Sequence, residues 1–317
     1  MTDRWRFSVG IGVTGLFFAL IHLGGLYVIT PLVGVDPAPG TDPSDPRMSL
    51  IFVGALLVGT GFMLVAFRWG LGWIVRTIVL VVAIGLMWVV LDVLLPPLFV
   101  YAGIPLVPVG LALVIIALLA LHPEWWVLDI VGVLLGAGAV GLLGLTLGIR
   151  PVIALLVILA VYDLISVYGT KHMLTLAEGA MEGRLPVVLV VPLTLPYSLR
   201  TTDSEDDSVA PEGALIIGLG DAVIPGMLAT SAALYGPVEP TVIGGLALSG
   251  PILGVIVGTM IGLVALFVIP EEGKAHPGLP FLVTGAIGGY LLGSLVVGVG
   301  PIEAIAAILF EPLFGRP

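Results

Sequence analysis

Two aspartates, Asp163 and Asp221, lie inside two separate apolar segments of the sequence. A carboxylate at membrane depth is costly unless it is neutral, paired or facing a wet cavity, so such residues mark functional sites. The interior of neither segment contains a Lys or Arg that could pair with its aspartate. Two close carboxylates without a cation cannot both be ionised, and they would share one proton.

A carboxylate pair that shares a proton can hydrolyse a peptide bond. One carboxylate activates water as a general base, and the protonated carboxyl polarises the carbonyl, as in aspartic proteases. The alternative is a pair of unrelated polar residues that hydrogen-bond to the backbone or to each other. The two aspartates alone do not decide between these interpretations.

The composition predicts a polytopic membrane protein. Of 317 residues, 59% are hydrophobic and 10% are charged, which leaves too little polar surface for a soluble domain. The chain has no cysteine, and its four histidines are scattered, so we expect no disulfide, no metal site and no other cofactor. The net charge of −10 argues against a nucleic-acid partner.

Nine hydrophobic runs are long enough to cross a bilayer as helices, which takes about 20 apolar residues each. They span residues 8–30, 48–68, 72–95, 97–121, 126–148, 151–171, 213–235, 241–269 and 279–299. We therefore predict an all-α polytopic membrane protein with nine transmembrane helices.

Basic residues set the expected orientation, because Lys and Arg favour the cytoplasmic side. With a cytoplasmic N-terminus, most of them fall inside: Arg4, Arg6, Arg68, Arg76, Lys171, Arg184, Arg200 and Lys274. The others fall outside: Arg47, Arg150 and Arg316. We therefore predict a cytoplasmic N-terminus and a C-terminus outside.

The chain divides into a scaffold of five helices, residues 1–150, and a part that carries the chemical motifs, residues 151–317. The second part includes a long cytoplasmic loop, 172–212, with an apolar run at Val187–Leu195 and an acidic stretch at Asp203–Asp207. Loops of this length are functional or disordered. The apolar run could be an interfacial segment of a flexible linker, a plug or a docking segment.

The two aspartates are expected to meet at one depth. Helices at 151–171 and 213–235 would be antiparallel neighbours, and a rise of 1.5 Å per residue puts each aspartate about 12 Å from the cytoplasmic end. Asp163, Ser166 and Thr170 follow an i, i+3, i+7 pattern, so they form a polar stripe that would face a wet interior.

The sequence around Asp221 favours close approach of other chain segments. Gly218 and Gly220 remove side-chain bulk near it. Pro225 cannot donate a hydrogen bond to the carbonyl of Asp221, which loosens the helix there.

A third element, His276-Pro277-Gly278-Leu279-Pro280, precedes the last predicted helix. Its prolines and glycine favour a rigid, non-helical start, whose free backbone groups need partners at membrane depth. An extended substrate strand could supply them. An ordinary helix-start proline is the alternative.

Together these elements resemble the GxGD aspartyl intramembrane proteases, the presenilin and signal peptide peptidase family. The family pattern has Y-D in helix six, G-x-G-D in helix seven and P-A-L before helix nine. Here the matching residues are Tyr162-Asp163, Gly218-Leu219-Gly220-Asp221 and Pro277-Gly278-Leu279, with Gly278 where alanine is usual. The resemblance covers about residues 151–298.

The resemblance implies hydrolysis of peptide bonds within transmembrane helices of membrane-protein substrates. Asp163 and Asp221 would be the catalytic pair, and the other motif residues would shape the site: Tyr162, Gly218, Leu219, Gly220, Pro277, Gly278 and Leu279. The orientation favours a presenilin, and the short loops favour an archaeal or other prokaryotic homologue in the cell membrane. Self-cleavage within 172–212 would match the presenilins.

Other polar and small residues have structural interpretations. Asp92 and Asp129 lie near helix ends, where we expect interfacial or structural roles. Glycines recur every fourth residue in the last two helices, at Gly250, Gly254, Gly258 and Gly262 and at Gly285, Gly289 and Gly293. They predict close helix packing, and that face could also hold another copy of the protein.

Two other functions compete with proteolysis. Paired membrane carboxylates also serve proton relays, so a proton- or ion-coupled transporter or channel would explain both aspartates. The first five helices, however, carry few polar groups that could line a translocation route for protons or ions. The second alternative is a non-enzymatic scaffold or ion-leak pathway, which needs neither carboxyl for proteolysis.

Overall fold

The computed structural model describes residues 2–35, 42–45, 47–97, 99–122, 124–170, 186–193, 214–269 and 276–299. These residues contain nine α-helices, as predicted: α1 (Thr2–Ile29), α2 (Arg47–Arg68), α3 (Gly72–Leu94), α4 (Leu106–Leu121), α5 (Trp125–Thr146), α6 (Ile149–Ile165), α8 (Leu219–Tyr235), α9 (Gly250–Val268) and α10 (Leu279–Val296). A 3₁₀ turn, η1 (Thr30–Leu32), follows α1, and a π-helical turn, η2 (Ser166–Thr170), follows α6.

The helices identify a multi-pass membrane protein. Seven of those in the described ranges are long and apolar enough to cross a membrane. The other two, α4 and α8, are apolar but shorter, with 16 and 17 residues.

The described residues also form three antiparallel hairpins, which were not predicted from the sequence. They pair β1 (Val100–Tyr101) with β2 (Ile104–Pro105), β3 (Val188–Pro192) with β4 (Ala214–Gly218), and β5 (Thr241–Ile243) with β6 (Leu246–Leu248).

Because of these hairpins, three predicted helices begin too early. The helix expected from residue 97 begins at Leu106, that from 213 at Leu219 and that from 241 at Gly250. Short runs rich in β-branched residues fit a strand as well as part of a membrane helix, so hydropathy alone merges them with the span that follows. The turn between β5 and β6 is made by Gly244 and Gly245, both at positive φ, as tight hairpin turns require.

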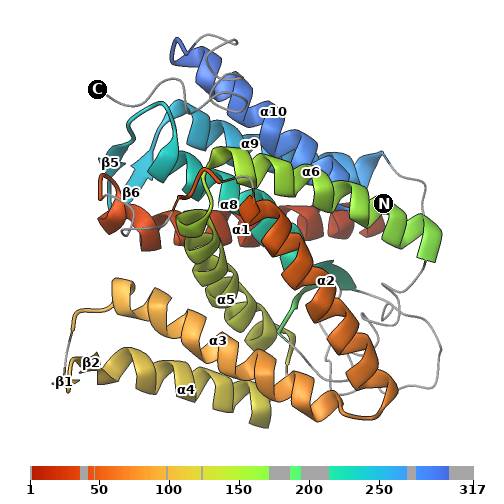
Figure 1. Ribbon diagram of the computed structural model, residues 1–317. Coiled ribbons are helices and arrows are strands. Elements are labelled where there is room, and N and C mark those ends of the chain that lie inside the picture. The colour runs from red at the N-terminus through yellow and green to blue at the C-terminus, as the bar shows by residue number, and fades with distance from the viewer. Residues whose placement is uncertain are drawn as a thin grey trace.

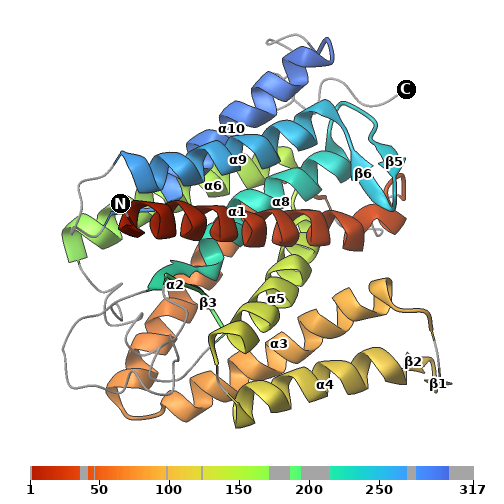
Figure 2. The same ribbon diagram turned by 180° about the vertical axis from the view of Figure 1, so that it is seen from behind.

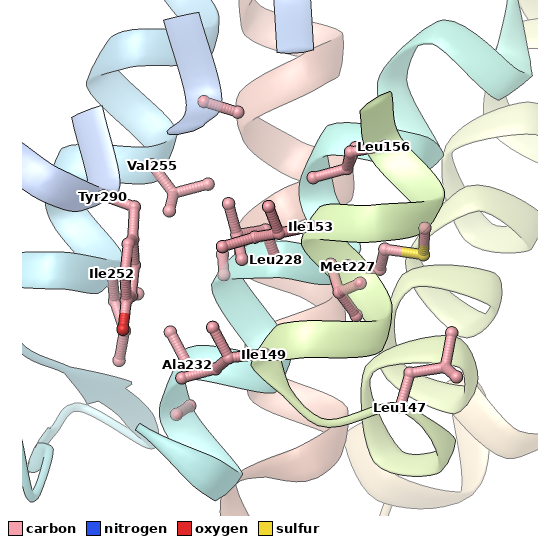
Figure 3. Packing of buried hydrophobic residues seen from close by; sticks show 14 of the residues in the cluster. Leu147, Ile149, Ile153, Leu156, Met227, Leu228, Ala232, Ile252, Val255 and Tyr290 are labelled. Atoms are coloured by element: carbon pink, nitrogen blue, oxygen red, sulfur yellow. The ribbon is translucent and has the colours of Figure 1, made fainter. Parts of the chain in front are cut away.

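Helix α8 lies at the centre of the helices that carry the motifs (Figures 1 and 2). It packs against α1, α5, α6, α9 and α10. Figure 3 shows the core between them, where Ile153 of α6 faces Leu228 of α8 and Val255 of α9. Helices α3 and α4 form a separate layer that packs on α5.

The predicted glycine face is the interface between α9 and α10. A methyl group placed on Gly254 would lie 2.0 Å from the backbone oxygen of Gly289, and one on Gly258 would lie equally close to that of Gly285. Only hydrogen fits at these positions. The prediction of close packing by small residues is therefore confirmed.

Candidate active site

Asp163 lies near the end of α6, and its side chain points into the protein. It is 7% exposed, and its Oδ2 accepts a hydrogen bond of 3.1 Å from the backbone N–H of Leu279. The backbone of Gly278 also interacts with this carboxylate. Ser166 is buried beside it. The backbone at the start of α10 therefore has a protein partner, where the sequence suggested a partner from the substrate.

Asp221 lies in the first turn of α8, because β4 ends at Gly218 and the helix begins at Leu219. The estimate of its depth from a helix starting at Gly213 is therefore wrong: an extended strand replaces the expected helical turns. This placement was missed because the strand and the helix form one apolar run.

The three sequence motifs converge on the carboxylate of Asp221. A methyl group on Gly278 would lie 3.3 Å from Asp221 Oδ2, and one on Gly218 would lie 3.5 Å from the same atom. The two aspartates are also close enough for their charges to interact. The structure thus brings together the carboxylates of α6 and α8 and the segment that opens α10.

The remaining motif residues surround this pair in different ways. Leu219 belongs to a buried apolar cluster with Phe18 and Ile21 of α1. Gly220 is exposed, and a methyl group on it would meet only Ile224, at 3.9 Å. Pro277 and Leu279 are buried, whereas Tyr162 is partly exposed.

Part of the long loop has a defined structure. The apolar run contributes β3, which pairs with β4 in the register Val188↔Gly218 to Pro192↔Ala214. The N–H of Leu219 donates to the carbonyl of Val187 at 2.8 Å and extends the ladder to the start of α8. The rest of 172–212, including the acidic stretch Asp203–Asp207, lies outside the described residues.

Two buried polar residues near the site have roles that the sequence did not specify. Nε2 of His22 in α1 lies 2.9 Å from the carbonyl oxygen of Ala222, one residue after Asp221. Gly226 makes room for the ring, since a methyl group there would lie 2.6 Å from His22 Cδ2. Asp129 of α5 accepts a hydrogen bond from Val190 of β3. In the sequence, these two contacts were indicated only by the presence of a single His or Asp within an apolar run.

The other expectations for polar residues have mixed outcomes. Asp129 is buried, which argues against the interfacial role. Asp92 is exposed near the end of α3, where its interfacial role stays a prediction. No group of three or more His, Asp or Glu within the described ranges could hold a metal ion.

The fold and the site define a polytopic membrane protein with an aspartate pair between two helices and a proline-glycine segment against it. The family described as "Signal-peptide peptidase, presenilin aspartyl protease" matches residues 15–299. The chain belongs to this family, and it is an intramembrane aspartyl protease of the presenilin type.

Solved structures agree with this assignment. One is the structure of a presenilin family intramembrane aspartate protease in the C222 space group, whose sequence is 31% identical to this chain. The two structures superpose with a TM-score of 0.63, and the match covers 90% of this chain and 99% of that chain. A structure in the P2 space group is 30% identical, with a TM-score of 0.62, over 89% and 96%. No curated protein matches the chain significantly.

Proposed function

We propose that Asp163 and Asp221 are the catalytic dyad, and that they hydrolyse peptide bonds within transmembrane helices of membrane-protein substrates. The observation that carries this proposal is that the motif of Asp221 meets the two others, which are distant in the sequence: Asp221 lies against Gly278 and close to Asp163. Paired carboxylates in such a setting share a proton. One activates water and the other polarises the scissile carbonyl.

The backbone at the start of α10 positions the dyad. The hydrogen bond from Leu279 fixes the Asp163 carboxylate, and Gly278 leaves room for that of Asp221. Pro277, Gly278 and Leu279 thus shape the site together with Tyr162, Gly218, Leu219 and Gly220. Water must reach the dyad, so we expect a polar cavity that opens to the cytoplasm beside Ser166 and Thr170.

The substrate binds as an extended strand along β4. A peptide bond in a helix is shielded by its own hydrogen bonds, so the cleaved segment has to unwind, and its backbone then needs new partners in lipid. β4 pairs only with β3 in the described part of the chain. Its other edge can therefore accept a strand, and β4 leads directly into Gly218 and Asp221.

The protein acts in the cell membrane of a prokaryote, with its N-terminus in the cytoplasm and its C-terminus outside. The helices of residues 1–150 support those of 151–317, which carry the catalytic motifs. Its partners are the transmembrane helices of substrates and the lipid bilayer, and a second copy of the protein is a further candidate. Self-cleavage within 172–212 would match the presenilins.

The test compares purified wild type with Asp163→Asn and Asp221→Asn on a transmembrane peptide in detergent. An amide cannot act as a general base, so we expect both variants to lose cleavage while keeping the thermal stability of the wild type. Unchanged proteolysis by Asp163→Asn would refute the dyad. If wild type moved protons across vesicles and cleaved no peptide, transport would replace proteolysis.

A further inference from the structure

The outer edge of β3 is occupied by a side chain from α5. Asp129 is 3% exposed, and its Oδ1 accepts a hydrogen bond of 2.8 Å from the backbone N–H of Val190. Its Oδ2 is buried without a hydrogen-bond partner among the described residues. An unsatisfied buried polar group costs about 1–3 kcal/mol. Burial of this carboxyl is therefore costly, and the hydrogen bond from Val190 offsets part of that cost.

The register of the hairpin shows which way Val190 faces. Leu219 donates to Val187, so these two residues form a hydrogen-bonded pair. In an antiparallel ladder such pairs alternate with pairs whose N–H and C=O groups point outward. Val190 and Ile216 form one of these outward pairs. The N–H of Val190 thus points away from β4 toward α5, and that of Ile216 points to the opposite edge.

Two features close the β3 edge to any further strand. Asp129 occupies the N–H of Val190, and Pro192, at the next outward position, has no N–H. Helix α5 also approaches β3 closely, since a methyl group on Gly132 would lie 3.1 Å from Leu189 Cδ2. Figure 2 shows β3 between α8 and α5.

We propose that Asp129 is a positioning residue for cleavage: it anchors β3 through Val190 and closes that edge, so that a substrate strand pairs only with β4. This inference rests on the proposed function, because it assumes that the substrate adds to β4. The sheet leads directly into Asp221, and an anchored sheet therefore fixes the register of the substrate against the dyad. Without the anchor, the sheet shifts and the cut positions spread.

The test locates the cuts in one transmembrane peptide by mass spectrometry, using Asp129→Leu and Asp129→Asn. Leucine has the same number and branching of side-chain heavy atoms as aspartate and cannot accept a hydrogen bond, whereas the amide oxygen of asparagine can. We expect Asp129→Leu to spread the products over several neighbouring bonds and to raise KM severalfold. We expect Asp129→Asn to keep the wild-type cut.

A second variant and a control separate positioning from stability. Val190→Pro removes the N–H that donates to Asp129, and this N–H makes no bond to β4. This variant should spread the cuts like Asp129→Leu, and it carries the test if Asp129→Leu does not fold. The control is Ser49→Ala, since buried Ser49 donates to the carbonyl of Pro151 at 2.8 Å, far along α6 from Asp163. This control should lower thermal stability and leave the cut in place.

The outcomes bear on the two proposals separately. If a folded Asp129→Leu cuts at the wild-type positions, the proposed role of Asp129 is wrong, whereas the proposed function stands. If only Val190→Pro folds, wild-type cut positions in that variant lead to the same conclusion. Spread cuts in Asp129→Asn would overturn this role too, because they would show that the hydrogen-bond acceptor is not what matters. If wild type did not cleave, the proposed function would fall, and this inference with it.

Discussion

The backbone N–H of Leu279 donates a hydrogen bond of 3.1 Å to Oδ2 of Asp163, across 116 residues of sequence. The third motif thus holds the first one directly, through its backbone. A backbone donor is present whatever the side chain, so the segment needs a fixed conformation more than particular side-chain chemistry. This explains how Gly278 can stand where related proteins have alanine.

The activity of variants at Gly278 should depend steeply on the size of the new side chain. The φ of −81° and ψ of −41° at Gly278 are open to any residue, and a methyl group would lie 3.3 Å from Asp221 Oδ2. We expect Gly278→Ala to keep activity within a few-fold of wild type. Gly278→Val should abolish it, because the larger side chain displaces the Asp221 carboxylate. The measurement is kcat/KM on a transmembrane peptide, and equal activity of the two variants would contradict this account.

The interface of α9 and α10 should not tolerate a single methyl group at Gly258. Its added Cβ would lie 2.0 Å from the carbonyl oxygen of Gly285, and overpacking of this kind costs about 1–3 kcal/mol. We expect Gly258→Ala to lower the thermal unfolding temperature in detergent. The matched control is Gly288→Ala in α10, where nothing lies within 4 Å. Equal unfolding temperatures for the two variants would show that the helices are not in close contact.

Activity should follow a bell-shaped pH profile. The dyad of Asp163 and Asp221 works with one shared proton, so activity falls at low pH when both carboxyls are protonated and at high pH when both are ionised. The two limbs of the pH profile report the titration of the pair as a whole, rather than of either residue. The measurement is kcat/KM against pH, with thermal stability followed over the same range. A rate that rises steadily with pH, with the protein still folded, would rule out the shared proton.

The predicted orientation can be tested with single cysteines, because the chain has none of its own. Thr241 and His122 are both exposed: Thr241 begins β5, which follows α8, and His122 lies directly after α4. If the N-terminus is cytoplasmic, Thr241→Cys should react with a membrane-impermeant maleimide in intact cells, and His122→Cys only after the membrane is opened. The reverse labelling pattern would show that the N-terminus lies outside, opposite to the predicted orientation.

The sequence predicted most of the helices, because spans of about 20 apolar residues leave few alternatives. It also indicated both aspartates, since an isolated carboxylate in such a span is conspicuous. The hairpin of β3 and β4 was not predicted, because the run from Ala214 into α8 is continuously apolar and hides the change from strand to helix. The depth estimate for Asp221 failed for the same reason.

Contacts between distant segments were beyond what one sequence can show. The partner of Asp129 lies 61 residues along the chain, and that of His22 lies 200 residues along it. Both partners are backbone groups, which leave no trace in the identity of the residue that carries them. Only the fold reveals that these buried side chains hold β3 and α8.

The most direct test of the central claim is to locate the cut in a transmembrane peptide by mass spectrometry, with wild type, Asp163→Asn and Asp221→Asn side by side. We expect wild type to cleave inside the apolar segment and neither variant to cleave, although all three proteins are folded. Cleavage only in the polar flanks, or cleavage at the same bond by either variant, would contradict the central claim.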